Sequence, residues 1–336
     1  MAQLSAITIT VLDGYTLNPG DNPWAPVSRL GSLTVYDRTP EHLIIERAQD
    51  ADIILTNKTP LTAATLEQLP RLRFICELAT GFDNIDTQAA ARLGIPVANV
   101  PEYSTASVAQ HTMALLLELC SRVGRHAASV SAGEWSSSPD FSYRLQPLTE
   151  LAGKTLGIVG FGRIGRQVAT IAHAMGMSIA ASAPRPKPTP AHLPVTWLCP
   201  DDLFRSADVI SLHCPACTDT VGFVDRRLLR LMKPTAFIIN TARGTLINEQ
   251  DLADALNTGT LSGAGLDVVA QEPIAPENPL LQAANCIITP HIAWASLAAR
   301  KRLTETAAGN IETFLAGTPQ HTVNTPITCS NRPLDK

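Results

Sequence analysis

Leu156–Gly165 has the sequence LGIVGFGRIG, and this stretch decides the fold class. Its first four residues predict a short buried strand, and the helical pattern Arg163–Met175 follows directly. The glycines fit G-x-G-x-x-G in the strand–turn–helix context that this pattern requires. We expect Gly160 to allow a tight turn, Gly162 to let a pyrophosphate approach the backbone, and Gly165 to let helix and strand pack closely.

Arg163 and Ile164 open the helix after this turn. A helix N-terminus offers unpaired N–H groups and a positive dipole end, both of which favour a phosphate. The sequence therefore predicts a dinucleotide-binding turn. A glycine-rich turn without a ligand is the alternative.

Strands and helices alternate on both sides of this turn, which predicts an α/β protein with two doubly wound parallel sheets: a flavodoxin-like substrate domain and a Rossmann domain. The predicted strands are 7–12, 33–36, 52–56, 73–77 and 95–99, followed by 155–159, 177–182, 208–213, 236–241, 263–268 and 286–289. The predicted helices are 41–49, 62–69, 84–93, 104–121, 163–175, 200–206, 225–232, 249–258 and 296–316.

The last of these helices can return the chain to the first sheet. We therefore expect a substrate-binding domain at 1–100 plus 293–336 and a dinucleotide-binding domain at 101–292. Residues 131–149 lose periodicity but carry Trp135, Phe141 and Tyr143. This segment is either a loop folded onto its own domain or an arm that packs on a second subunit. The polar, proline-containing tail after Thr318 is expected to be loosely ordered.

Composition excludes several classes of protein. The chain has 336 residues, of which 45% are hydrophobic and 17% charged, and its net charge of −4 lacks long runs of one sign. This balance argues against a disordered chain, a nucleic-acid partner and a membrane partner. The start of the chain lacks the features of a secretory signal, and the seven scattered cysteines predict reduced thiols in the cytoplasm and no metal site.

The second strand of the glycine-turn unit bears on the type of cofactor. An NAD-selective unit places Asp or Glu near the end of that strand, against the ribose 2′-hydroxyl. Here Ala183 follows the strand and no carboxylate is present. Arg185, with Ser182 as a hydrogen-bond partner and Lys187 adding less, suits a 2′-phosphate and favours NADP. The alternative is a solvated basic loop in an enzyme that also accepts NAD.

Three segments follow the carboxyl ends of later strands, where open α/β sheets bind ligands. They contain Arg243, Glu272 and His291. His291 can donate a proton to a carbonyl oxygen near neutral pH, and Glu272 can favour its protonated form and fix its tautomer. Arg243 can hold a substrate carboxylate and polarise the adjacent carbonyl. Each residue also has a purely structural alternative: Arg243 as a member of an ion pair, Glu272 as a turn residue and His291 as a helix-entry residue. Three such structural roles together explain the pattern less well than a shared site.

These segments resemble the D-isomer-specific 2-hydroxyacid dehydrogenases over nearly the whole chain. The matching stretches are 79–86, 105–111, the glycine turn, 212–215, and the segments around Arg243, Glu272 and His291. The resemblance implies that Arg243, Glu272 and His291 are the catalytic triad. It places substrate against Asn57, Thr80, Gly81, Arg243, His291 and Trp294. It places cofactor against Thr105, Cys214, Pro215, Thr220, Thr241, Ala242, Arg243, His291 and Asp267, in addition to the glycine turn.

Within that family, the Thr56–Lys58 loop and the stretch His291–Ser296 look most like glycerate dehydrogenases, also called hydroxypyruvate or glyoxylate reductases. The resemblance implies reduction of a small 2-oxo acid to the D-hydroxy acid and a homodimer. Gln110 departs from the family's usual Glu, and Ala183 departs from the Asp of NAD-dependent members. A nucleotide-sensing corepressor-like module and a dehydrogenase for formate, phosphite or a bulkier hydroxy acid are the alternatives.

Overall fold

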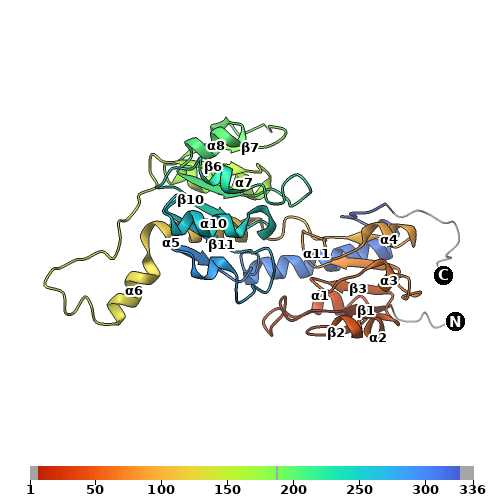
Figure 1. Cartoon of the computed structure of the whole chain (residues 1–336). Coiled ribbons are helices and arrows are strands. Elements are labelled where there is room, and N and C mark those ends of the chain that lie inside the picture. Colours follow the sequence, from red (N-terminus) through yellow and green to blue (C-terminus); the bar gives the residue numbers. More distant parts are fainter. Residues whose placement is uncertain (1–6, 187, 326–336) are drawn as a thin grey trace, which may run out of the picture. The chain divides into compact units, whose positions relative to one another are not determined.

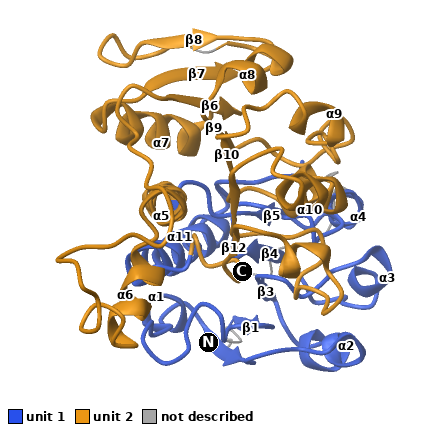
Figure 2. Ribbon diagram, turned by 60° about the vertical axis from the view of Figure 1, so that its left-hand side comes forward, with its two compact units in different colours: residues 1–104, 295–336 blue, residues 105–294 orange. Residues whose placement is uncertain are grey.

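The computed structural model describes residues 7–186 and 188–325 and divides into two compact units. Unit 1 contains 1–104 and 295–336, and unit 2 contains 105–294 (Figure 2). Each unit is built on one parallel sheet, which confirms the predicted α/β class with two parallel sheets. No helix in the described ranges combines the length and apolar character that crossing a membrane requires.

Unit 1 has five strands in the order β2-β1-β3-β4-β5, the flavodoxin-like order. They are β1 (Thr8–Val11), β2 (Ser32–Val35), β3 (Ile53–Thr56), β4 (Phe74–Glu77) and β5 (Val97–Ala98). Every residue of β3 and β4 is buried, as expected for central strands covered on both faces. The carboxyl ends of β3 and β4 lead into the loops that carry Asn57 and Thr80.

The helices of unit 1 are mostly short. They are α1 (Ala25–Ser28), the 3₁₀ turn η1 (Glu41–Leu43), α2 (Ile44–Ala48), α3 (Ala63–Leu66), α4 (Thr87–Arg92) and α11 (Leu297–Leu315). The last helix joins the unit from the far end of the chain: Phe314 stacks on Phe74 of β4 with ring centroids 4.5 Å apart. The expected return of the C-terminal helix to the first sheet is therefore observed.

The expectation of a loosely ordered tail was wrong for residues 319–325. The backbone N–H of Val323 donates to the carbonyl of Val97 at 2.8 Å, and that of Asn99 donates to His321 at 3.2 Å. The Asn324 side chain accepts from the Val97 N–H at 2.8 Å. This polar segment is ordered because it supplies partners to β5, an edge strand. Residues 326–336 lie outside the described range.

Unit 2 has seven strands in the order β12-β11-β10-β9-β6-β7-β8, which contains the Rossmann order. They are β6 (Thr155–Val159), β7 (Ser178–Ser182), β8 (Val195–Trp197), β9 (Val209–Leu212), β10 (Phe237–Asn240), β11 (Gly263–Leu266) and β12 (Cys286–Ile288). All their pairings are parallel, so the loops after β6, β7, β9, β10, β11 and β12 leave the same edge of the sheet.

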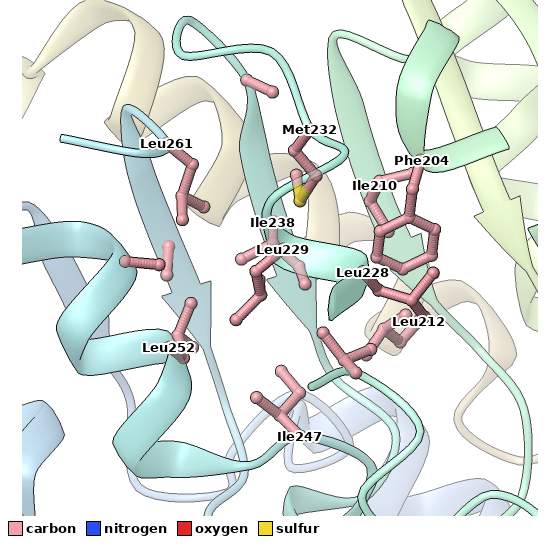
Figure 3. Packing of buried hydrophobic residues seen from close by; sticks show 14 of the residues in the cluster. Phe204, Ile210, Leu212, Leu228, Leu229, Met232, Ile238, Ile247, Leu252 and Leu261 are labelled. Atoms are coloured by element: carbon pink, nitrogen blue, oxygen red, sulfur yellow. The ribbon is translucent and has the colours of Figure 1, made fainter. Parts of the chain in front are cut away.

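Helices and 3₁₀ turns complete unit 2 (Figure 1). They are α5 (Thr105–Ser121), α6 (Val123–Ser131), α7 (Arg163–Ala174), α8 (Pro200–Ser206), α9 (Arg226–Leu229), η2 (Gly244–Leu246), α10 (Glu249–Asn257) and η3 (Pro279–Gln282). One of the two apolar clusters beside the sheet is shown in Figure 3, where Phe204, Leu228 and Leu252 pack toward Ile210 and Ile238 of the strands. This packing holds the loops at the strand ends in place.

The sequence patterns did not predict α1, α6, β8 or the 3₁₀ turns η2 and η3. The sequence of α6, VGRHAASVS, contains a glycine and two alanines and lacks a broad apolar stripe. Its preceding residue, Arg122, has a φ of +53°, and this left-handed residue separates α6 from α5. β8 has only three residues at the edge of its sheet. Short elements of this kind carry too few residues to show a period.

Candidate active site

The glycine turn between β6 and α7 has the geometry that suits a bound dinucleotide. Gly160 has a φ of +93°, and a Cβ built on it would lie 2.6 Å from the backbone nitrogen of Cys214. A Cβ on Gly165 would lie 2.5 Å from the carbonyl oxygen of Gly160, so only glycine allows this approach of α7. Gly162 precedes α7, and no atom lies within 4 Å of a Cβ added there. The turn is tightly packed at Gly160 and Gly165 and open at Gly162, so it fits a pyrophosphate.

The end of β7 lies beside this turn. The N–H of Gly160 donates to the carbonyl oxygen of Ser182 at 2.9 Å. Ser182 is buried, Ala183 is half-buried and Arg185 is exposed. Residues 182–186 thus offer the Ser182 hydroxyl and the Arg185 guanidinium and contain no carboxylate. Lys187 lies outside the described residues.

Arg243 is held by a turn that Asn240 closes at the end of β10. Asn240 is completely buried, and its side-chain amide donates to the carbonyl of Arg243 at 2.8 Å. The Asn240 side-chain oxygen accepts from the N–H of Ala242 at 3.0 Å. Arg243 itself is half-buried, and its guanidinium donates to the Ala242 carbonyl at 2.8 Å. The hydrogen bonds of Asn240 therefore fix the backbone from which the Arg243 side chain extends.

Gly244 brings the arginine loop against the loop that leads to Glu272. A Cβ on Gly244 would lie 1.9 Å from the carbonyl carbon of Val269 and 2.4 Å from the nitrogen of Ala270. Both contacts are with backbone, which cannot rotate away. Glu249 of α10 secures the second loop by accepting from the N–H of Ala270 at 2.7 Å. Arg243 and Glu272, 29 positions apart, are thereby carried by two loops in direct contact.

Glu272 and His291 form a close side-chain pair. Nδ1 of His291 lies 2.6 Å from Oε2 of Glu272, and the two side chains remain partly exposed. The other oxygen of Glu272 accepts from the N–H of Val269 at 3.3 Å. His291 has a φ of +54°, which is uncommon for a residue other than glycine, and its N–H donates to the carbonyl of Asp267 at 2.8 Å. Nδ1 faces the carboxylate, so Nε2 is the nitrogen left to act on a ligand.

Asp267 holds the backbone of the histidine loop. Its carboxylate accepts from the N–H groups of Ile292 at 2.9 Å and Ala293 at 2.8 Å and from the hydroxyl of Thr289 at 2.6 Å, while Nε2 of His111 lies 3.4 Å away. Burial alone would raise the pKa of Asp267, but the hydrogen bonds from His111, Thr289 and the two N–H groups outweigh it and lower the pKa. Asp267 is therefore a buried anion that shapes the loop.

The other residues predicted to contact cofactor lie in unit 2. Cys214, Pro215 and Thr220 follow β9, and the Thr220 hydroxyl donates to the Pro215 carbonyl at 2.8 Å. Thr241 follows β10, and its hydroxyl lies 2.9 Å from that of Thr112 in α5. The remaining four are Ala242 after Thr241, Arg163 and Ile164 in the first turn of α7, and Thr105 at the start of α5. Apart from Thr105, these residues lie at or beyond strand carboxyl ends.

Three of the predicted substrate residues lie in unit 1. Asn57 is buried, and its side chain donates to the carbonyl of Leu78 at 2.7 Å. Thr80 is exposed, and its hydroxyl donates to Val100 at 3.0 Å. Gly81 follows it in the same loop after β4. Trp294, by contrast, lies in unit 2, three residues after His291, and is half-buried.

Glu77, the last residue of β4, is completely buried beneath this loop. Asn84 donates to its Oε2 at 3.2 Å, and Oε1 has no hydrogen-bond partner among the described residues. Burial raises the pKa of Glu77 well above its ordinary value, although the bond from Asn84 works against this. Burial at the end of the strand that precedes Thr80 therefore favours the protonated form of the Glu77 carboxyl.

Sequence reasoning missed the supporting roles of His111, Asn240 and Gly244. Nε2 of His111, a residue within the predicted helix 104–121, lies 2.9 Å from the Thr289 hydroxyl. Asn240 precedes its partner by three residues, a spacing typical of side-chain-to-backbone turns, so a local signal existed. The partners of His111 and Gly244 are distant in sequence and carry no such signal.

No group of three or more histidine, cysteine, aspartate or glutamate side chains in residues 7–186 and 188–325 is arranged to hold a metal ion. The polar groups described above at the strand ends are instead an arginine, a carboxylate–imidazole pair, hydroxyls and backbone N–H groups.

Comparison with known proteins agrees with this geometry. Residues 113–293 match the family model of the D-isomer specific 2-hydroxyacid dehydrogenase, NAD binding domain. The chain is 48% identical over 319 residues to a hydroxypyruvate reductase from Blautia hydrogenotrophica, covering 94% of this chain and 99% of the relative. It is 42% identical over 287 residues to a glycerate dehydrogenase from Methylorubrum extorquens, covering 85% and 89%.

Solved structures show the same fold. An NADPH-dependent glyoxylate/hydroxypyruvate reductase from Sinorhizobium meliloti, in complex with NADP and malonate, superposes with a TM-score of 0.83 at 26% identity, covering 97% of this chain and 99% of that one. The family match spans more than half of the chain, and the Blautia relative matches nearly all of it. The chain therefore belongs to the D-isomer specific 2-hydroxyacid dehydrogenase family of oxidoreductases.

Proposed function

We propose that this protein reduces a small 2-oxo acid, hydroxypyruvate or glyoxylate, to the corresponding D-2-hydroxy acid with NADPH or NADH. The observation that carries the proposal is the 2.6 Å contact between Nδ1 of His291 and Glu272, beside the loop of Arg243 and on the same unit as the glycine turn. The names of the relatives from Blautia, Methylorubrum and Sinorhizobium support this choice of substrates.

Each residue of the triad has a separate task in this reaction. A bound nicotinamide dinucleotide supplies the hydride. His291 donates a proton from Nε2 to the carbonyl oxygen of the substrate, while Glu272 holds Nδ1 and stabilises the protonated ring. Arg243 binds the substrate carboxylate and polarises the neighbouring carbonyl. The buried Asp267 keeps the histidine loop in the conformation in which Nε2 is available.

The glycine turn would bind the pyrophosphate of the cofactor through N–H groups at Gly162 and the start of α7. Family resemblance assigns Thr105, Cys214, Pro215, Thr220, Thr241 and Ala242 to the same ligand. It assigns the backbone N–H groups of Thr80 and Gly81 to the substrate carboxylate, and Asn57 and Trp294 to the rest of the substrate. The buried amide of Asn57 would act mainly by fixing its loop, because it already bonds to Leu78.

Initial rates with a panel of 2-oxo acids test the proposed reaction. The panel contains hydroxypyruvate, glyoxylate, pyruvate and a bulky branched 2-oxo acid, each with NADPH and NADH. We expect the highest kcat/KM with hydroxypyruvate or glyoxylate, and the product should be the D-hydroxy acid. A preference for the bulky acid, or oxidation of formate or phosphite at a higher rate, would overturn the choice of substrate.

Replacing Glu272 by Gln should lower kcat while leaving cofactor affinity nearly unchanged. The change keeps the side chain's size but removes the charge next to His291. Hydrogen bonds to charged groups contribute about 1.5–3 kcal/mol, which corresponds to a loss of about 10–100-fold. The measurement is kcat together with the Kd of NADPH. A kcat within twofold of wild type would mean that the contact with His291 does not serve the reaction.

We infer a preference for NADPH from the end of β7. Arg185 is exposed there and Ala183 carries no charge that would repel a 2′-phosphate. A charge-assisted hydrogen bond of about 1.5–3 kcal/mol corresponds to a preference of about 10–100-fold. Arg185→Ala should therefore weaken NADPH kinetics and spare NADH, and Ala183→Asp should shift the preference toward NADH.

The measurement is kcat/KM for both cofactors in wild type and the two variants. The glycine turn would also bind NADH, because its contacts with the pyrophosphate do not distinguish the two cofactors. A wild type that prefers NADH about tenfold, or an Arg185→Ala variant with unchanged NADPH kinetics, contradicts this assignment.

The segment after α5 is proposed to bind a second copy of the chain. Figure 1 shows α6 and the following loop projecting from the sheet of unit 2. The segment is tied to itself: the Trp135 indole donates to the carbonyl of Phe141 at 3.0 Å, and Ser129 lies 2.7 Å from the Tyr143 hydroxyl. Even so, 91% of Phe141 and 51% of Trp135 remain exposed. Exposed aromatic side chains on a projecting segment are typical of an interaction surface, and we therefore favour the predicted homodimer. The cytoplasmic location stays a prediction.

A further inference from the structure

Two cysteines that the proposed reaction does not use as thiols lie next to the glycine turn. Cys214-Pro215-Ala216-Cys217 is a C-x-x-C sequence in the loop after β9. The backbone of this loop touches the turn directly, because a Cβ on Gly160 would lie 2.6 Å from the nitrogen of Cys214. A change in the shape of this loop therefore reaches the dinucleotide-binding turn.

Cys217 is the exposed member of the pair. Its Sγ lies 3.3 Å from Oγ1 of Thr220, and its N–H donates to the same oxygen at 2.8 Å. That hydroxyl in turn donates to the carbonyl of Pro215, so the loop folds around one polar group. The hydrogen bond with Thr220 lowers the pKa of Cys217, which increases the share of reactive thiolate.

Cys214 is half-buried and has the opposite character. Burial raises the pKa of Cys214 to about 11, and the neighbouring charge of Cys217 contributes in the same direction. Cys214 is therefore a protonated thiol, three residues before a reactive one in the same loop. An exposed nucleophile and a shielded thiol at C-x-x-C spacing are the combination that dithiol redox sites use.

The other described cysteines lack this combination. Burial raises the pKa of Cys76 and of Cys286 to about 12 and that of Cys120 to about 11, which disfavours their thiolates. Cys199 is exposed, but its thiol donates to the carboxylate of Asp202 at 3.2 Å and has no second cysteine nearby in sequence. Cys199 is thus a matched control for exposure alone.

We propose that Cys214 and Cys217 are a redox-active pair that a peroxide converts to an intramolecular disulfide, and that the disulfide weakens binding of the nicotinamide dinucleotide. The second half of this proposal rests on the proposed function. Through this pair, a rise in peroxide concentration would lower the affinity of the protein for its cofactor.

The reaction balances with hydrogen peroxide as the oxidant. The Cys217 thiolate attacks one peroxide oxygen, the O–O bond breaks, and a sulfenic acid forms with release of one water after proton uptake. The sulfur of Cys214 then attacks the Cys217 sulfur, the S–O bond breaks, and hydroxide leaves with the proton of Cys214 as a second water. The two sulfurs lose two electrons, and the peroxide gains them.

The test begins with the reduced full-length protein, whose NADPH and NADH affinities and 2-oxo-acid reduction are measured first. This step judges the proposed function independently. Samples are then treated with limited hydrogen peroxide, and excess peroxide is removed. After proteolysis, the mass of the peptide that contains Cys214 and Cys217 is measured by mass spectrometry. The Kd of the preferred cofactor is measured again by fluorescence, before and after dithiothreitol.

We expect a loss of two hydrogens in that peptide and a rise in Kd of about tenfold or more, the size of one lost hydrogen bond to a charged group. Dithiothreitol should reverse both. Cys217→Ser should show no such mass loss and an unchanged Kd after peroxide, whereas Cys199→Ser should behave like wild type. The proposal is overturned if the mass loss is absent in wild type, if the disulfide forms without a change in Kd, if Cys217→Ser loses affinity equally, or if the reduced protein binds neither cofactor.

Discussion

His291→Ala is expected to reduce kcat by about 10²–10⁴-fold, the contribution of general acid catalysis. The imidazole is the group whose Nδ1 is held by Glu272 at 2.6 Å, leaving Nε2 to donate a proton. Alanine removes the donor but leaves Asp267 able to bind the backbone N–H groups of Ile292 and Ala293. The loop should therefore persist, and the loss should appear in kcat.

Steady-state kinetics and NADPH binding by fluorescence separate chemistry from affinity. The Kd of NADPH should stay close to that of wild type, because the pyrophosphate turn lies on another loop. His42→Ala, at an exposed position of η1, is the control and should retain full activity. A loss of less than about tenfold in kcat at neutral pH would remove His291 from its assigned role.

Gly244→Ala is expected to damage both stability and turnover. Its Cβ would lie 1.9 Å from the carbonyl carbon of Val269, and a backbone contact of this kind forces the two loops apart. Overpacking typically costs about 1–3 kcal/mol in the free energy of unfolding, and backbone clashes lie at the upper end. Separation of the loops would also move Arg243 away from Glu272, so kcat/KM should fall even in the folded fraction.

Gly309→Ala is the matched control for this substitution. Gly309 lies within α11, and no atom outside the helix backbone comes within 4 Å of an added Cβ. Alanine should there raise the free energy of unfolding by about 0.5–1 kcal/mol. Urea unfolding and kcat/KM of the two variants are the measurements. Equal stability of Gly244→Ala and wild type would show that the two loops are free to separate at no cost.

Local patterns identified most strands and helices of the sheets because apolar runs and helix caps are encoded in neighbouring residues. β6 and α8 have the predicted bounds, 155–159 and 200–206, since an apolar run forms the strand and Pro200 starts the helix. The Asn248 side chain caps α10 by accepting from the backbone N–H of Asp251, three residues further along the chain. The order of residues 319–325 was not predictable in this way, because it depends on β5 as a partner.

The sequence by itself determined the α/β class and the glycine turn, because strand–turn–helix patterns are visible along one chain. It also predicted Arg243, Glu272 and His291 as the triad, through the resemblance of their segments to a known family. Only the tertiary structure decided that Glu272 contacts Nδ1 of His291 and that Asp267 accepts hydrogen bonds from the backbone of the histidine loop. It also decided that the backbone at Gly244 lies against the loop that leads to Glu272. These contacts join residues 19 or more positions apart in the sequence at one edge of a sheet. Parallel pairing creates that edge, and no local pattern records which side chains it brings together.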